Sequence, residues 1–282
     1  MTEKRKGELL MLTCAVMWSI SGIIIKYIDW SPFTIAGARS LISAVVVVVF
    51  MMATKLKPVV NRNSVISGVF LSGCITCFVV ANKLTTAANA IVLQYIAPVF
   101  VLIITAVFLK QKLKKMEIGV VAFTFGGIVL FFLGEISFGG MLGNFVAIFS
   151  GLCMAICFIV NGTIEIDARM TGILVAHLIT AAIGIPLGLA TYNTVVTSQD
   201  LILILILGVV QLGIPYVLYA MAASRISPLS CSLIGMIEPL LNPIWVAVFY
   251  GEIPGLFALI GGVVVIVSVV VYNVWDEKQS SL

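Results

Sequence analysis

The sequence predicts an all-α integral membrane protein whose ten transmembrane helices form two inverted-topology repeats of five helices. Of the 282 residues, 61% are hydrophobic and only 10% are charged, and the mean hydropathy is +1.21. These values lie outside the range of soluble domains. Apolar runs of about 20 residues, each long enough to cross the hydrocarbon core as a helix, recur along the whole chain. Two of these runs are similar to each other, at a distance of 141 positions.

The internal repeat is clearest around two prolines. Residues 96–108 align with residues 237–249 with six identities in thirteen positions, among them Pro98 with Pro239. Such self-similarity indicates a duplicated unit. Five spans is an odd number, so the second copy enters the bilayer in the opposite orientation, as in many transporters. We therefore expect a first repeat over residues 1–136 and a second over residues 137–282.

Ten apolar segments are long enough to span the membrane. In the first repeat they cover residues 9–28, 33–53, 64–82, 87–109 and 116–134. In the second they cover residues 142–161, 171–190, 201–223, 228–250 and 254–274. Polar or charged residues separate each segment from the next, as expected where the chain leaves the lipid.

The charges predict the orientation, because Lys and Arg collect in cytoplasmic loops. With the N-terminus inside, 13 of the 16 basic residues fall on the inner side: Lys4, Arg5, Lys6, Lys55, Lys57, Arg62, Lys110, Lys112, Lys114, Lys115, Arg169, Arg225 and Lys278. The outer loops carry Asp29, Glu135, Asp200 and Glu252. Both termini are therefore expected in the cytoplasm, in a multi-pass protein of the plasma membrane. Anionic lipid explains the net charge of +4 better than nucleic acid does.

The sequence offers no sign of a cofactor, a metal site or a nucleotide-driven pump. It has a single histidine and neither a G-x-x-x-x-G-K-[ST] loop nor an H-E-x-x-H motif. All six cysteines fall within predicted spans, where Cys74-x-x-Cys77 is more typical of helix packing than of redox chemistry. Any transport must then be passive or driven by an ion or solute gradient.

Two segments resemble a known family. Residues 81–90, leading into Gln94-Tyr95-Ile96-Ala97-Pro98, resemble the first EamA repeat of the drug/metabolite transporter superfamily. Residues 224–228 followed by Glu238-Pro239 resemble the second repeat, although Lys110 and Gln111 depart from the family's L-G-E pattern in the first copy. The resemblance implies export of amino acids or other metabolites. The family also includes carriers of sugars, nucleotide sugars and drugs.

Pro98 and Pro239 fall near the centres of the fourth and ninth spans. Each removes one backbone donor and clashes with the carbonyl group four residues earlier, so each is expected to break its helix. Such breaks are tolerated at membrane depth where they line a cavity or meet neighbouring helices. The two breaks are predicted to flank a central site, with kinks that serve packing alone as the alternative.

Glu238 is the one acidic residue predicted at mid-bilayer, where an ionised carboxylate costs on the order of 3 kcal/mol. Helical spacing places it on one face with Asn242 and Trp245. We expect Glu238 and Asn242 to contact a polar or cationic group of a substrate. The alternative is an acid that is protonated or hydrogen-bonded for structural reasons.

Arg39 and His177 form a second related pair, each about six residues into its span. They are candidates for coupling or gating, and His177 could serve a coupled proton. Arg39 could instead extend to the headgroups, and His177 could be a neutral residue in a helix interface.

Aromatic and amide side chains near the span centres are the remaining candidates for substrate binding. They are Trp18, Gln94, Tyr95, Tyr216, Tyr219 and Trp245. A ring can stack on an apolar or cationic part of a substrate, although core packing explains any single ring equally well.

These features together predict a carrier that moves small organic metabolites, amino acids or related amphipathic compounds, by alternating access. Partners are then the substrate, membrane lipid and a coupled proton, and a monomer suffices because one chain can build the whole pathway. An intramembrane enzyme and a channel are the alternatives. An enzyme would need a cluster of ionisable residues at one depth, and Glu238 alone does not supply it.

Overall fold

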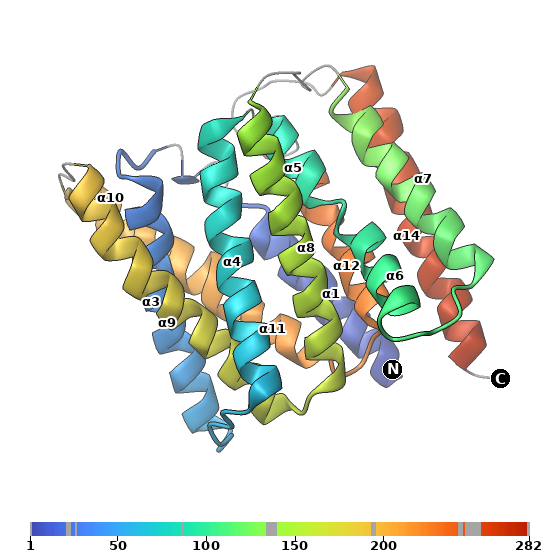
Figure 1. Cartoon of the computed structure of the whole chain (residues 1–282), viewed down its shortest axis with the longest axis horizontal. Helices are drawn as coiled ribbons and strands as arrows, with labels where there is room; N and C mark the ends of the chain where they lie inside the picture. The colour runs from blue at the N-terminus through green and yellow to red at the C-terminus, as the bar shows by residue number, and fades with distance from the viewer. Residues whose placement is uncertain are drawn as a thin grey trace.

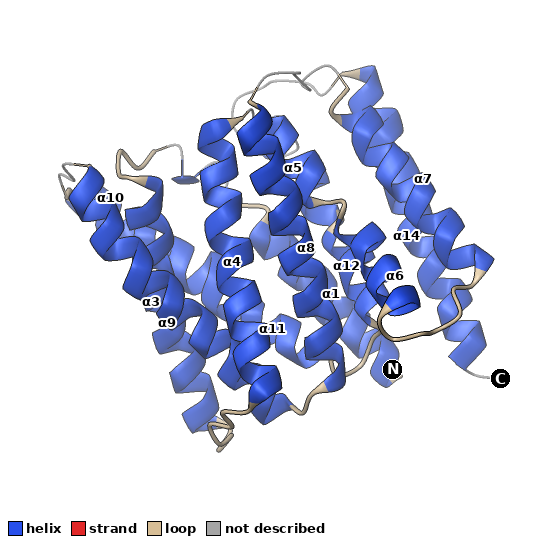
Figure 2. Ribbon diagram, viewed as in Figure 1, coloured by secondary structure: helices blue, strands red, loops and turns tan. Residues whose placement is uncertain are grey.

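The computed structural model describes residues 2–20, 24–25, 27–85, 87–133, 140–192, 196–241, 245 and 255–280. Within these ranges the regular elements are all helices (Figures 1 and 2). In chain order they are α1 (Glu3–Trp18), α3 (Pro32–Ala53), α4 (Arg62–Leu84), α5 (Ala87–Gln94), α6 (Ala97–Val107), α7 (Lys115–Phe131), α8 (Met141–Thr163), α9 (Ile166–Thr191), α10 (Ser198–Ile206), the π-helix η1 (Leu207–Gly213), α11 (Ile214–Ala222), α12 (Pro228–Gly235) and α14 (Leu256–Ser280).

Seven helical segments of the described chain are long and apolar enough to cross a membrane. They are Pro32–Ala53, Arg62–Ala81, Asn89–Val107, Met141–Thr163, Ile166–Thr191, Ser198–Ala222 and Leu256–Gln279. The expected first and fifth spans correspond to the shorter helices α1 and α7, with 16 and 17 residues. The expected ninth span corresponds to the apolar helix Pro228–Leu241. An apolar multi-pass helical membrane protein is therefore confirmed, and the count of ten spans stays a prediction.

The helix pairings follow an internal symmetry. If each predicted span is exchanged for its counterpart in the other repeat, α3 packing on α9 and α7 packing on α14 map onto themselves. The packing of α1 on α11 maps onto that of α8 on α4, and α4 on α9 maps onto η1 on α3. This is the pattern of two related helical units. The predicted boundary between residues 136 and 137 lies outside the described residues.

Small residues bring α3 and α9 into close contact. A Cβ atom on Gly184 would lie 2.7 Å from the carbonyl oxygen of Phe33, and one on Gly37 would lie 2.7 Å from the backbone nitrogen of Ile185. One turn further on, a Cβ atom on Gly188 would lie 2.5 Å from the backbone nitrogen of Thr34. In lipid, where no hydrophobic force drives helices together, such backbone contacts supply much of the packing energy.

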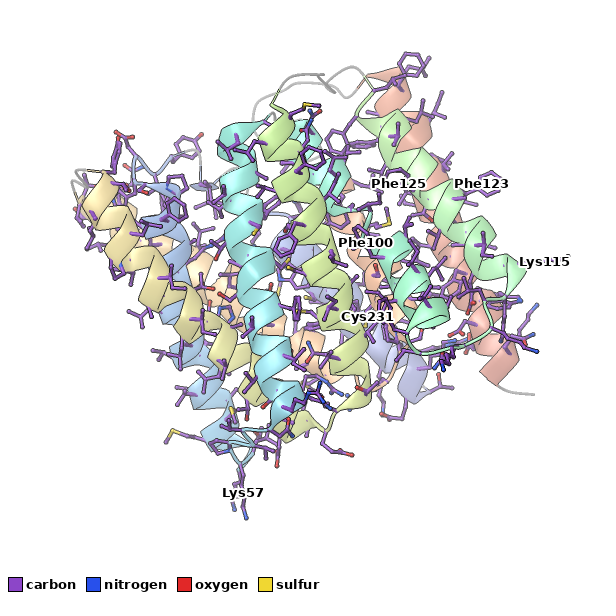
Figure 3. The ribbon with its side chains drawn as sticks, in the orientation of Figure 1. Lys57, Phe100, Lys115, Phe123, Phe125 and Cys231 are labelled. Carbon is purple, nitrogen blue, oxygen red and sulfur yellow. The ribbon has the colours of Figure 1, made fainter. Side chains whose placement is uncertain are left out.

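Both termini lie at one end of the bundle, where ion pairs join them (Figure 1). The ammonium group of Lys4 lies 2.6 Å from the carboxylate of Asp276, and Arg5 lies 3.1 Å from Glu277. Lys57 also lies at the lower end of the molecule in this orientation (Figure 3). This end therefore carries several of the residues that the charge pattern assigns to the cytoplasmic side.

Two helices depart from the expected regular spans. The helix of the first expected span ends at Trp18. The hydroxyl group of Ser19 donates to the carbonyl oxygen of Val16 at 2.6 Å and stabilises a turn there. The helix of the eighth expected span widens into the π-helix η1 between α10 and α11. Such π segments are frequent at functional sites, and hydrophobicity alone does not predict them.

Candidate functional site

The fourth and ninth spans are both interrupted, at equivalent positions of the two repeats. The first interruption is the turn at Tyr95 and Ile96, between α5 and α6, and Pro98 is the second residue of α6. The second is the turn at Met236, after which the chain is helical again and contains Pro239. Position 236 corresponds to position 95 in the repeat alignment, so both breaks lie three residues before the proline.

Neighbouring helices accommodate the first break. Because Pro98 has no N–H group, the carbonyl oxygen of Gln94 receives no helical hydrogen bond from it. The glycine Gly151 of α8 lies against this oxygen, and a Cβ atom there would be 2.5 Å away. The side-chain nitrogen of Gln94 donates to the hydroxyl of Ser150 at 2.9 Å, and this hydroxyl donates to the carbonyl oxygen of Cys74 at 2.9 Å. Gln94 thus joins α5, α8 and α4 through hydrogen bonds.

A hydrogen bond between the repeats joins the two breaks. The phenolic oxygen of Tyr95 donates to a carboxylate oxygen of Glu238 at 2.5 Å. Only 3% of the Tyr95 side-chain surface is exposed. The acid predicted at mid-bilayer therefore has a polar partner, and that partner comes from the opposite repeat. Asn242, expected beside Glu238, lies outside the described residues.

Aromatic side chains gather in the buried core that also contains Tyr95, and we call them the aromatic cluster: Trp18, Phe158, Tyr216, Tyr219 and the ring of His177. The ring centroids of Trp18 and Tyr216 are 5.4 Å apart, and those of Trp18 and Tyr219 are 6.2 Å apart. Three of the residues predicted for substrate binding thus lie in mutual contact. They come from α1 and α11, which are far apart in the sequence and pack side by side.

The tyrosine Tyr219 is held by polar groups of α8. Its hydroxyl group donates to the carbonyl oxygen of Cys157 at 3.4 Å and accepts from the amide nitrogen of Asn161 at 3.2 Å. The amide oxygen of Asn161 accepts from Ser67 of α4 at 2.9 Å. This network fixes the ring orientation of Tyr219 and joins α11 to the α4–α8 pair.

Arg39 does not extend to the membrane surface, since only 5% of its surface is exposed. Its Nη1 group donates to the side-chain oxygen of Gln211 at 3.2 Å. The side-chain nitrogen of Gln211 donates in turn to the carbonyl oxygen of Trp18 at 3.4 Å. Gln211 lies in η1, so the π-helix supplies the residue that joins Arg39 to the aromatic cluster.

His177 is fully buried, and neither ring nitrogen has a hydrogen-bond partner among the described residues. Its ring meets that of Tyr216 edge-on, with centroids 5.2 Å apart. The helix α9 begins at Ile166, five residues before the predicted start of this span, so His177 is closer to the middle of its helix than expected. Because His177 contacts Tyr216 and Gln211 joins Arg39 to Trp18, both members of the predicted gating pair lie beside predicted substrate residues.

Trp245 is placed by one hydrogen bond, from its indole nitrogen to the hydroxyl of Ser19 at 2.8 Å. The turn that ends α1 therefore also contacts the chain that follows the second break. Ser19 was not a candidate in the sequence, because a single serine in an apolar run carries no distinctive signal.

Arg169 is a second buried cation that the charge pattern assigned to an inner loop. Its guanidinium group donates to three carbonyl oxygens, of Asn161 at 2.6 Å, Ala220 at 2.7 Å and Ile164 at 2.5 Å. These carbonyls come from the ends of α8 and α11, where backbone oxygens lack helical partners. Arg169 thus satisfies two helix ends at once, a role that only the tertiary structure reveals.

A separate groove lies on the outer surface between α7 and α14. Its lining is apolar and consists of Ala122, Phe123, Gly126, Gly127, Leu130 and Val264. The side chain of Phe123 points away from the bundle (Figure 3). The groove contains none of the candidate residues. In the described part of the chain, no three His, Cys, Asp or Glu side chains come together in a way that could hold a metal ion.

Interrupted helices that meet at a buried polar centre within an apolar bundle define a class of membrane transporters. The model of the EamA-like transporter family matches residues 5–133 and 141–274. The chain belongs to this family of transporters, and hence to the drug/metabolite transporter superfamily.

Two individual proteins are similar over nearly the whole chain. An uncharacterized transporter of Archaeoglobus fulgidus is 23% identical over 290 residues, which cover 97% of each chain. A protein of known crystal structure superposes with a TM-score of 0.81 at 15% identity, over 94% of this chain and 96% of the other. At that identity the structural likeness concerns the fold.

Proposed function

We propose that this transporter is a secondary carrier for small organic metabolites, namely amino acids or related amphipathic compounds, and that it exports them across the plasma membrane. The observation that carries the proposal is the hydrogen bond between Tyr95 and Glu238, because it joins the interrupted helices of both repeats. In carriers built from inverted repeats, substrate and coupling ions bind where such helices meet.

The proposed binding site comprises the aromatic cluster and the residues around the two breaks. Trp18, Tyr216, Tyr219 and Trp245 would contact the apolar part of the substrate. Glu238, together with Gln94, Tyr95 and Asn242, would bind its polar or cationic group. In the present conformation the candidate residues Trp18, Tyr95, Tyr216 and Tyr219 are each at most 8% exposed, which suits a closed intermediate of alternating access.

Movement between open states would take place at the breaks, where the helices lack regular hydrogen bonds. The turns before Pro98 and Pro239 would act as hinges. Arg39 and His177 lie on α3 and α9, whose close packing would have to be retained while the rest of the bundle moves. We propose that these two residues control opening, and that a proton bound at Glu238 or His177 is the coupled ion.

Flux assays on the purified protein in liposomes test this proposal. Vesicles preloaded with unlabelled leucine, threonine or phenylalanine should take up the labelled amino acid by saturable counterflow, faster with a pH gradient than without one. Flux that never saturates would indicate a channel, and formation of a new product without net flux would indicate an enzyme. Inward-facing and outward-facing preparations then test the direction of transport.

A further inference from the structure

Three buried nitrogen-bearing side chains near Tyr216 have hydrogen-bonding groups without a partner in the described part of the chain. They are the indole N–H of Trp18, the Nε group of Arg39, and the two ring nitrogens of His177. Trp18 and His177 both contact the ring of Tyr216, and Gln211 connects Arg39 to the backbone of Trp18. The three residues come from three different helices, α1, α3 and α9.

Unpaired groups of this kind are costly. A buried donor that lacks a partner loses about 1–3 kcal/mol, and a charged donor loses more. Arg39 forms no ion pair within the described residues, and its hydrogen-bond partner there is the neutral amide of Gln211. A buried guanidinium group normally has a carboxylate or another oxyanion beside it. No described side chain supplies such an anion beside Arg39.

The nearest candidate counter-ion is already engaged. Glu238 interacts with the charge of Arg39 at a distance, but its hydrogen bond comes from Tyr95. No ion pair joins Arg39 to Glu238 among the described residues. Arg39 is therefore left with one buried donor, its Nε group, that no described side chain satisfies.

We propose that Arg39, together with the N–H groups of His177 and Trp18, binds the carboxylate group of the transported molecule. The inference rests on the proposed function and specifies one subsite of it. A neutral imidazole offers one N–H donor, an indole offers another, and guanidinium donors are arranged in a planar fork that matches a carboxylate. One guanidinium charge balances one carboxylate charge. A phosphate dianion would leave a second charge uncompensated inside the membrane.

Matched sets of compounds test the proposal on the purified, full-length protein. Each set contains an amino acid, the amine without its carboxylate, and the acid without its amine: leucine, isoamylamine and 4-methylpentanoate, or phenylalanine, phenethylamine and 3-phenylpropanoate. Inorganic phosphate is included as a different oxyanion. Binding is measured as the rise in unfolding temperature with concentration, which gives an apparent Kd for each compound.

The wild-type protein is expected to bind the amino acids and the acids, and to bind the amines and phosphate much more weakly. The variant Arg39→Gln should raise the apparent Kd of the acids about 10- to 100-fold, in line with the loss of a charge-assisted hydrogen bond. Arg39→Lys keeps the charge but loses the planar arrangement of donors. Its apparent Kd for the acids should lie between those of the wild type and Arg39→Gln. Lys57→Gln, which removes an exposed positive charge, should bind as the wild type does.

Two results would overturn the proposal. One is binding of the amines and not of the acids, with a dependence on Glu238, which would leave the central transport site in place but remove the carboxylate subsite. The other is acid binding that survives in Arg39→Gln. If Arg39→Gln does not fold, His177→Ala and Trp18→Phe provide the same comparison between acids and amines. Saturable counterflow of a compound that lacks a carboxylate would show that the protein is a carrier although the carboxylate subsite is absent. Failure of this inference is thereby distinguished from failure of the proposed transport function.

Discussion

The hydroxyl group of Tyr95 donates a hydrogen bond of 2.5 Å to the carboxylate of Glu238. Tyr95 lies in the turn that interrupts the fourth span, and Glu238 lies two residues after the turn at Met236 that interrupts the ninth. The two residues do not occupy equivalent repeat positions, since position 95 corresponds to position 236. The duplicated backbone is therefore symmetric at the breaks, whereas the polar contact between them is not.

Removal of this contact is expected to impair transport and also to lower stability. Tyr95→Phe deletes the donor, and Glu238→Gln replaces the carboxylate by a neutral amide. Each change should lower saturable counterflow about tenfold, because a hydrogen bond to a charged group contributes about 1.5–3 kcal/mol. Glu238→Gln should also flatten the dependence of the rate on pH.

The double variant Tyr95→Phe/Glu238→Gln separates this contact from independent effects. Both changes act through one bond, so the double variant should be no slower than the worse single variant. Glu277→Gln, which removes an acid at the end of the bundle, serves as the control and should transport normally. An unchanged rate and pH profile in Glu238→Gln would show that Glu238 is a structural acid.

Arg169 is expected to be essential for stability. Arg169→Ala leaves three carbonyl oxygens at the ends of α8 and α11 without their donor. Because each unsatisfied buried group costs about 1–3 kcal/mol, the variant should lose at least about 2 kcal/mol of stability. The measurement is the unfolding temperature in detergent. Arg62→Ala, at an exposed position, should change stability by less than about 0.5 kcal/mol. Equal effects of the two substitutions would contradict the role of Arg169.

The α3–α9 interface should tolerate no added side chain at Gly184. A Cβ atom there would lie 2.7 Å from the carbonyl oxygen of Phe33, so Gly184→Leu would force the helices apart. We expect little folded protein, seen as aggregation in size-exclusion chromatography. Gly126 of α7 is the matched control, because a Cβ atom added there meets nothing within 4 Å. Normal elution of Gly184→Leu would show that the interface can separate without loss of the fold.

The stability that the exposed ion pairs of Glu3 contribute should depend on pH. Hydrogen bonds from Lys6 and Arg225 lower the pKa of Glu3 below its ordinary value of 4.5. A lowered pKa means that the folded protein favours the ionised acid. The small stabilisation is present above pH 4.5 and is lost as the pH falls through the pKa in the folded state.

Unfolding temperatures of the wild type and Glu3→Gln, compared across pH, test this dependence. They should differ slightly near neutral pH and converge as the pH falls from 4.5 through the lowered pKa of Glu3. High salt should remove the difference at every pH, because exposed charges are screened. A difference that grows on acidification would contradict the assignment.

Much of the architecture follows from the sequence because lipid imposes simple rules. Backbone groups in hydrocarbon must pair internally, so long apolar runs have to be helices, and the two prolines can only interrupt them. The repeat around Pro98 and Pro239 therefore predicts both breaks to within a few residues. The break at Ser19 and the widened turn at Gln211 were not predicted, since neither has a proline or a change in hydrophobicity to mark it.

Local sequence patterns do not show which residues meet at the candidate site. The sequence identified Glu238 as an acid that needs a partner, but hydrophobic periodicity cannot tell which helix supplies it. Arg39 illustrates the same point, because a basic residue near a span end is compatible both with contact to the headgroups and with burial. Its hydrogen bond to Gln211 depends on the packing of α3 against η1, between residues 172 positions apart.

The sequence by itself determined that this chain is a duplicated, helical membrane protein with a broken helix in each repeat, because hydropathy, charge and proline act locally along the chain. Only the tertiary structure decided that Tyr95 pairs with Glu238, that Arg39 and His177 share one centre with the aromatic cluster, and that Arg169 satisfies two helix ends. These contacts join residues far apart in the chain, and their energy depends on distances that only the packed bundle sets.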